Sequence, residues 1–281
     1  PSSPRYNELR MSHLHGFSSS INWRFVWLVI AAFLAGAINA VAGGGSFLSF
    51  PALLAMRILP VQANATNTVA IWPGQLTSIA AYREDVRKNS RSAWLMGIAG
   101  LLGGTTGAAV LLNTPQRTFM HLVPWLLFGA ACIFAVSGPV SRGLERLKLR
   151  RREEARAGHV HSPHRVALFV FTMLISFYVG YFGAGAGFLL LTMLALIGYE
   201  DMHAINALKI VANMLANGSA FLIFVLGNHV VWRYGLPALI ACATGGYVSA
   251  RHARRVPQRI LRTGVVILGL SMAAWFFWHQ S

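Results

Sequence analysis

Long apolar runs alternate with short polar breaks along most of the chain. They occupy roughly residues 23–42, 47–56, 61–82, 94–113 and 118–137, and then 166–182, 188–198, 203–226, 231–250 and 259–278. A helix needs about 20 mostly apolar residues to cross a bilayer, and the second run of each set of five is too short for that. The pattern predicts an all-α polytopic membrane protein built from two five-segment repeats, each with a Gly-interrupted short helix.

The polar stretches set the boundaries of the predicted domains. We expect an N-terminal tail over residues 1–22, a first transmembrane repeat over 23–138, a basic cytoplasmic linker over 139–165 and a second repeat over 166–281. Residues 1–10 precede Met11 and are left out of the fold prediction. Within the linker, the Arg/Glu-rich residues 142–156 are expected to form a short cytoplasmic helix.

The two sets of five runs align residue by residue, which indicates an internal duplication. Three pairs lie 141 positions apart: Gly44 with Gly185, Phe47 with Phe188, and Leu53 with Leu194. Further on, a Gly-Gly pair and a Pro-Gln-Arg turn recur 142 positions apart, at Gly103, Gly104 and Pro115 and again at Gly245, Gly246 and Pro257. Paired short segments interrupted by glycine are typical of the substrate site of a transporter.

The distribution of Lys and Arg favours inverted repeats. If each short segment counts as a crossing, each repeat has five crossings and the repeats are inverted, with 17 Lys/Arg inside and 4 outside when residues 1–10 and Lys209 are left out. If the short segments re-enter, the repeats are parallel and the tally is 14 against 7. Cytoplasmic loops carry the excess of positive charge, so the first arrangement is preferred.

The glycines of the stretch NAVAGGGSFLSFP predict an anion site in the middle of the membrane. Gly43, Gly44 and Gly45 break the helix that contains Asn39, and a new helix begins at Ser46. The first N–H groups of a helix have no partner within it and attract anions. In the second repeat, the glycines that correspond to this break are Gly183, Gly185 and Gly187. Two such helix ends facing each other would form one central pocket.

Close helix packing is the alternative role for these glycines. We expect that packing role for the later cluster that comprises Gly100, Gly103, Gly104 and Gly107.

A polar stripe in the second repeat points to the same chemistry. Asn206, Lys209, Asn213 and Asn217 are spaced three or four residues apart and share one helix face. Lys209 lies well inside an apolar run, where a charge is costly, so we favour contact with an anion over snorkelling to the membrane surface. In the first repeat the matching helix carries Asn64, Thr66, Asn67, Thr68 and Gln75, with Thr68 in register with Lys209. For Asn217 and Gln75 we favour interhelical hydrogen bonding.

Composition excludes several other classes of function. The chain has 281 residues, 55% of them hydrophobic and only 11% charged, and its net charge of +16 is concentrated between apolar runs. That distribution is typical of cytoplasmic loops and not of a nucleic-acid surface. Cys132 and Cys242 lie in apolar runs as free thiols, and the three histidines of the linker, His159, His161 and His164, lack closed metal-ligand geometry. No Asp or Glu lies inside an apolar run, so we expect no enzyme, metal or cofactor chemistry and no carboxylate proton relay.

These motifs resemble the sulfite exporter TauE/SafE family. The resemblance rests on AGAINAVAGGGSFLSFPALL, QANATNTVAIWPG and the weaker second copy YVGYFGAGAGFLLLTMLALIG. It implies a bacterial inner-membrane carrier of a sulfur-containing or organic anion, with sulfite or a sulfonate such as sulfoacetate as leading substrates. The family's Gly-rich segment maps onto Gly43, Gly44, Gly45 and Ser46, with Gly185 and Gly187, and its Thr/Ser-containing helix start maps onto residues 65–68. The second copy reads AINALK there instead of small hydroxylated residues.

The function expected from the sequence is therefore secondary transport, with export as the expected direction, of a small sulfur-containing anion by alternating access at a central site between the repeats. The predicted substrate-binding residues are Asn39, Gly43, Gly44, Gly45, Ser46, Asn67, Thr68, Gly183, Gly185, Gly187, Asn206, Lys209 and Asn213. The expected partners are the anion and the lipid bilayer, no nucleic acid, and a homodimer is compatible with the sequence. An anion channel, or a carrier of another small organic anion, is the alternative.

Overall fold

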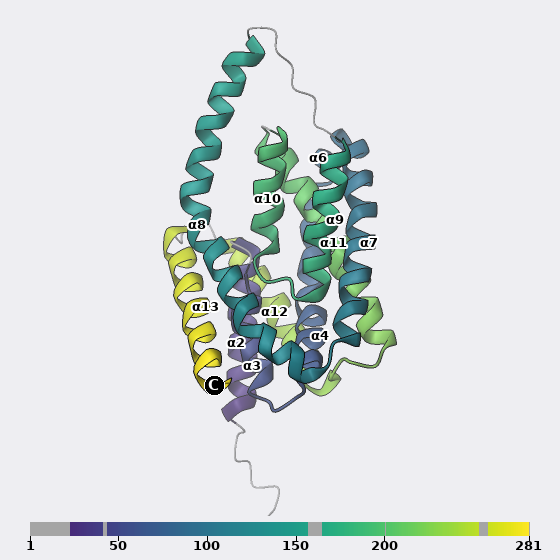
Figure 1. Cartoon of the computed structure of the whole chain (residues 1–281), viewed down its shortest axis with the longest axis vertical. Helices are drawn as coiled ribbons and strands as arrows, with labels where there is room; N and C mark the ends of the chain where they lie inside the picture. The colour runs from purple at the N-terminus through teal and green to yellow at the C-terminus, as the bar shows by residue number, and fades with distance from the viewer. Residues whose placement is uncertain (1–22, 42–43, 157–164, 200, 253–257, 281) are drawn as a thin grey trace, which may run out of the picture.

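Helices make up the regular structure of the described part of the chain (Figure 1). The computed structural model describes residues 23–41, 44–156, 165–199, 201–252 and 258–280. The first repeat contains α2 (Trp23–Val41), α3 (Ser46–Leu54), α4 (Pro60–Ile71), α5 (Pro73–Ala81), α6 (Arg83–Lys88), α7 (Ser90–Asn113) and α8 (Gln116–Arg156). The second contains α9 (Arg165–Tyr181), α10 (Ala186–Ile197), α11 (Met202–Leu226), α12 (Trp232–His252) and α13 (Gln258–Gln280). The all-α prediction is confirmed.

The helices follow the apolar runs with three differences, of which the first is the additional short helix α6 over a polar break. The run over 61–82 is divided between α4 and α5 at Trp72, because Pro73 has no N–H to continue the hydrogen-bond ladder. Residues 142–156 are not the separate short helix that the sequence suggested. They continue α8, which is 41 residues long and rises beyond the rest of the bundle in Figure 1.

Two helices of the described residues, α7 and α11, are long and apolar enough to span a bilayer on their own. Shorter apolar helices cover Trp23–Asn39, Arg165–Tyr181, Ala186–Ile197 and Val266–Trp278. Large apolar side chains also lie on the outside of the bundle, where Trp94 is 74% exposed and Leu226 is 84% exposed. Exposed apolar surface of this kind is expected where lipid is the solvent.

The largest helix contacts join one repeat to the other. α7 packs along α9, and α12 packs along α2. A Cβ added to Gly103 of α7 would collide with the carbonyl oxygen of Met173, and one added to Gly245 of α12 would collide with that of Phe33. Gly100, Gly104 and Gly107 likewise lie against neighbouring backbone. The packing role predicted for the Gly100–Gly107 cluster is thus confirmed.

Helices that match in the two repeats run in opposite directions in Figure 1. α2 begins at the lower end of the bundle, whereas α9 begins at the upper end, beside the linker. α8 rises to the linker, whereas α13 descends to the C-terminus and packs against α8. This arrangement brings the two short helices, α3 and α10, into the bundle from opposite sides.

Candidate functional site

The first glycine break shapes the start of α3. Gly44 is buried and has a φ of 94°, a backbone conformation that residues with a Cβ rarely adopt. Gly45 lies against the backbone of Ala35 in α2, where a Cβ would collide with the carbonyl oxygen. Gly43 lies outside the described residues. Gly45 therefore has a packing role, and the half-buried Ser46 begins the helix beside it.

The second glycine break forms a comparable turn before α10. Gly183 and Gly185 have φ values of 78° and 77°. The Tyr178 hydroxyl donates to the carbonyl oxygen of Ala184, 2.7 Å away, and so ties the turn to α9. A Cβ built on Gly187 meets nothing within 4 Å, whereas one built on Gly45 or Gly183 meets backbone atoms. Gly187 therefore has the open surroundings that a ligand requires.

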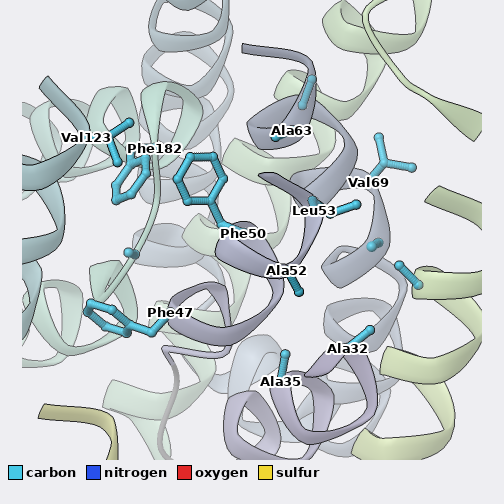
Figure 2. Packing of buried hydrophobic residues seen from close by; sticks show 14 of the residues in the cluster. Ala32, Ala35, Phe47, Phe50, Ala52, Leu53, Ala63, Val69, Val123 and Phe182 are labelled. Atoms are coloured by element: carbon cyan, nitrogen blue, oxygen red, sulfur yellow. The ribbon is translucent and has the colours of Figure 1, made fainter. Parts of the chain in front are cut away.

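Side chains next to the two breaks are in contact (Figure 2). The Phe50 ring of α3 packs edge-on against the Phe182 ring, with their centroids 5.5 Å apart. Phe119 of α8 lies against the same pair. The Asn64 side chain of α4 donates to the carbonyl oxygen of Tyr181, at a distance of 3.0 Å. The breaks are therefore neighbours, and aromatic rings fill the space where Phe50 meets Phe182.

Two open hollows of the described residues lie elsewhere. One, of about 330 Å³, is lined by Phe25, Met56, Arg233 and Tyr234, and the other, of about 460 Å³, by Glu84, Arg87 and Lys88. Neither borders a glycine break.

A buried polar pair joins the first short helix to α4. The Ser49 hydroxyl lies 2.5 Å from Oδ1 of Asn67 and 3.2 Å from the carbonyl oxygen of Gly45. Ser49 is 0% exposed and Asn67 is 2% exposed. Thr68 donates to the backbone of Asn64 one turn back. Sequence reasoning singled out Asn67 and Thr68 but missed Ser49, which it treated as one residue of an apolar run.

The matching positions in the second repeat are apolar. Leu190 of α10 and Leu208 of α11 lie 141 positions after Ser49 and Asn67, and both are fully buried in one cluster. The two halves of the chain therefore carry different chemistry at these aligned positions.

Lys209 lies half-buried on α11. Its Nζ donates to Oδ1 of Asn206, 3.0 Å away, and no carboxylate of the described residues pairs with it. A charge away from bulk water needs a partner, and a neutral amide supplies only part of the compensation. Lys209 is thus a cation with capacity for an anionic ligand.

The rest of the polar stripe meets α5. The Asn217 amide donates to the backbone of Asn213 at 3.0 Å and approaches Oε1 of Gln75 at 3.5 Å. The interhelical contact predicted for Asn217 and Gln75 is thus present, at the upper limit of hydrogen-bond distance. Asn39 lies half-buried near the end of α2, and no hydrogen bond joins it to another described residue.

The predicted site residues therefore fall into separate groups. Gly45 and Asn67 meet through Ser49, Asn206 meets Lys209, and Asn213 meets Asn217. No hydrogen bond among the described residues joins one group to another.

Comparison with known proteins identifies the family. Residues 28–276 match the family model described as sulfite exporter TauE/SafE. The chain belongs to the sulfite exporter TauE/SafE family. It is a membrane transporter and not an enzyme.

Relatives of this TauE/SafE protein cover nearly its whole length. It is 29% identical over 252 residues to the probable membrane transporter protein ORF9 of a Sinorhizobium species, with 88% of this chain and 90% of that protein aligned. It is 25% identical over 258 residues to a probable membrane transporter protein of Haemophilus influenzae, covering 90% and 94%. It is 28% identical over 254 residues to the probable membrane transporter protein YfcA of Escherichia coli K12, covering 88% and 87%. No solved structure matches the chain significantly.

Proposed function

We propose that this TauE/SafE protein is a multi-pass carrier of the bacterial inner membrane that exports a small sulfur-containing anion, such as sulfite or a C2 sulfonate like sulfoacetate. The observation that carries the proposal is Lys209, a half-buried cation whose side chain is hydrogen-bonded, within the described part of the chain, to the neutral Asn206 amide alone. An ammonium in that setting gains most from an anionic ligand, because an ion pair away from bulk water is weakly screened.

The two short helices supply the second element of the proposed site. α3 and α10 begin at the glycine breaks, so the positive ends of both helix dipoles lie there. The N–H groups of Phe47 and Phe188 donate to the carbonyl oxygens of Gly44 and Gly185, so an oxyanion would be attracted by the helix dipoles and not by these two groups. The open surroundings of Gly187 support an approach to the α10 end. In the proposed bound state, the anion lies between the two breaks, and Lys209 and Asn206 contribute from α11.

Inverted repeats would give the carrier its mechanism. The opposite directions of α2 and α9 and the reciprocal pairs α7–α9 and α2–α12 support this arrangement. Under alternating access, one repeat rocks against the other around a fixed site. The contact of Phe50 with Phe182 is then the closed barrier, which must separate for the anion to pass.

Export needs no coupling carboxylate. At about 100 mV, inside negative, each exported negative charge gains ~2.3 kcal/mol. The membrane potential is therefore a sufficient driving force for outward movement of a monovalent or divalent anion.

Flux through proteoliposomes tests the function. Purified protein is reconstituted, the vesicles are loaded with unlabelled sulfite or sulfoacetate, and uptake of the labelled anion is followed. A carrier gives saturable flux and transient accumulation of label by exchange. Flux that rises linearly with concentration, without exchange, would favour the channel alternative. Absence of flux for every small anion, with folded protein verified, would refute both.

A further inference from the structure

Asn64 of α4 connects the first half of the chain to the second glycine break. Its side chain is 1% exposed, and its Nδ2 donates to the carbonyl oxygen of Tyr181, 3.0 Å away. Tyr181 is the last residue of α9, directly before the turn that contains Gly183 and Gly185. Asn64 therefore reaches from the first repeat to the second break.

The other end of the same amide is without a partner. Oδ1 of Asn64 is buried, and no donor of the described residues bonds to it. The orientation of the amide is determined by its neighbour, because the Tyr181 carbonyl accepts hydrogen bonds and would repel Oδ1. A buried acceptor left unsatisfied is unfavourable, so this oxygen is a position at which a donor is required.

The unpaired oxygen lies one helical turn from the buried polar pair of α3 and α4. Asn67 follows Asn64 by three residues and lies on the same face of α4. Asn67 contacts Ser49, whose hydroxyl also lies 3.2 Å from the Gly45 carbonyl at the start of α3. The N–H groups of Phe47 and Leu48 at that helix start already donate to the carbonyl oxygens of Gly44 and Gly45, so what the start of α3 offers an anion is the positive end of the helix dipole, whereas Oδ1 of Asn64 requires a donor. A single ligand satisfies both if it is an oxyanion that carries its own hydrogen-bond donor.

We propose that Asn64 selects oxyanions with a hydrogen-bond donor over equally charged oxyanions without one. This inference rests on the proposed function. Hydrogen sulfite has the donor on the anionic group itself, and hydroxyalkanesulfonates have it on a carbon atom. Sulfate, sulfoacetate and unsubstituted alkanesulfonates have none, so each places an acceptor against Oδ1. Among the substrates of the proposed function, the inference therefore ranks hydrogen sulfite and hydroxyalkanesulfonates above sulfoacetate.

Two matched ligand pairs test the selection in the unmodified protein. The first pair is 2-hydroxyethanesulfonate and ethanesulfonate, and the second is hydrogen sulfite and methanesulfonate. Binding of each anion is measured by thermal shift and by competition with labelled substrate in proteoliposomes. One hydrogen bond gained by a buried acceptor predicts roughly tenfold tighter binding of the donor-carrying member of at least one pair. The pair that discriminates shows whether the donor belongs on the sulfur group or on carbon.

Asn64→Ala then assigns the selection to this residue. In this variant the two members of the discriminating pair should bind with about equal affinity, because the acceptor oxygen of Asn64 has been removed. Asn113→Ala is the matched control, since Asn113 is an exposed amide that donates to the Ala109 carbonyl, and it should keep the full preference.

The outcomes separate this inference from the proposed function. Equal binding within both pairs by the unmodified protein, with transport intact, would overturn the role of Asn64, even if Asn64→Ala fails to fold. A preference that survives in folded Asn64→Ala would also overturn it. Absence of transport for all of these anions would instead contradict the proposed function.

Discussion

The indole N–H of Trp72 donates to the carbonyl oxygen of Met214, 3.0 Å away and 142 positions later in the chain. The same offset separates Gln75 from Asn217, which approach each other at 3.5 Å. It is also the offset at which the Pro-Gln-Arg turn recurs in the sequence. In the register of 141 that pairs Thr68 with Lys209, Trp72 matches Asn213 and Gln75 matches Ala216, one residue away from these contacts. Segments that nearly match in the two halves of the chain therefore meet where α4 and α5 cross α11.

Trp72→Phe tests the contribution of this crossing. The change removes the N–H donor but keeps an aromatic ring against Phe221, whose centroid lies 4.8 Å from that of Trp72. We expect a loss of about 0.5–1.5 kcal/mol in unfolding free energy, measured by denaturant titration in detergent. An unchanged unfolding free energy would mean that the hydrogen bond makes no net contribution.

Gly103→Val tests the packing between α7 and α9. A Cβ at this position collides with the carbonyl oxygen of Met173, so the helices must separate, at a cost of about 1–3 kcal/mol or more. Gly129→Ala in α8 is the control, because a Cβ there meets nothing within 4 Å. The melting temperature should fall for Gly103→Val only. Equal melting temperatures for the two variants would contradict the close approach of α7 and α9.

Gly187→Ala separates binding from stability. The added Cβ meets no atom within 4 Å, and alanine is favoured over glycine inside a helix by roughly 1 kcal/mol, so the melting temperature should hold or rise. If an anion approaches the start of α10, the methyl group occupies part of its space and the apparent KM for transport rises. An unchanged KM would remove Gly187 from the proposed site.

The polar pair of the first repeat is predicted to serve transport more than folding. The double change Ser49→Ala with Asn67→Leu replaces both partners by apolar groups, which is often nearly neutral for stability. It imitates the apolar Leu190 and Leu208 of the second repeat. We expect folded protein with at least about tenfold lower transport, as for loss of one strong polar contact.

The reverse change is the control for that experiment. Leu208→Asn buries an amide in an apolar cluster, and it should cost about 1–3 kcal/mol of stability. Full transport by the Ser49/Asn67 double variant would show that this pair has no part in substrate movement.

The sequence predicted the helices well because membrane helices depend mainly on apolar length. It also predicted the packing role of Gly103 and its neighbours, since small residues at helical spacing allow close approach. It did not divide α4 from α5, although Pro73 is a recognisable break signal. It separated residues 142–156 from α8, because the change from apolar to Arg/Glu-rich composition resembles a boundary even where the backbone stays helical.

Fewer contacts of the candidate site than of the fold could be predicted from the sequence. Asn67 and Lys209 stood out as polar residues inside apolar runs, but no sequence pattern pairs Asn67 with Ser49. The link from Asn64 to the Tyr181 carbonyl joins residues 117 positions apart and depends on a backbone acceptor, which side-chain patterns do not identify. The contact of Phe50 with Phe182 likewise arises only from the packing of one repeat against the other.

The central claim is tested most directly by comparing anion binding in the unmodified protein and in Lys209→Met. Binding of sulfite or sulfoacetate is measured by calorimetry and by the ligand-dependent rise in melting temperature. Lys88→Met is the control, since Lys88 is an exposed cation of α6. The account predicts saturable binding to the unmodified protein and to Lys88→Met, and affinity at least about tenfold lower for folded Lys209→Met. Equal affinity of all three proteins for the anion would contradict it.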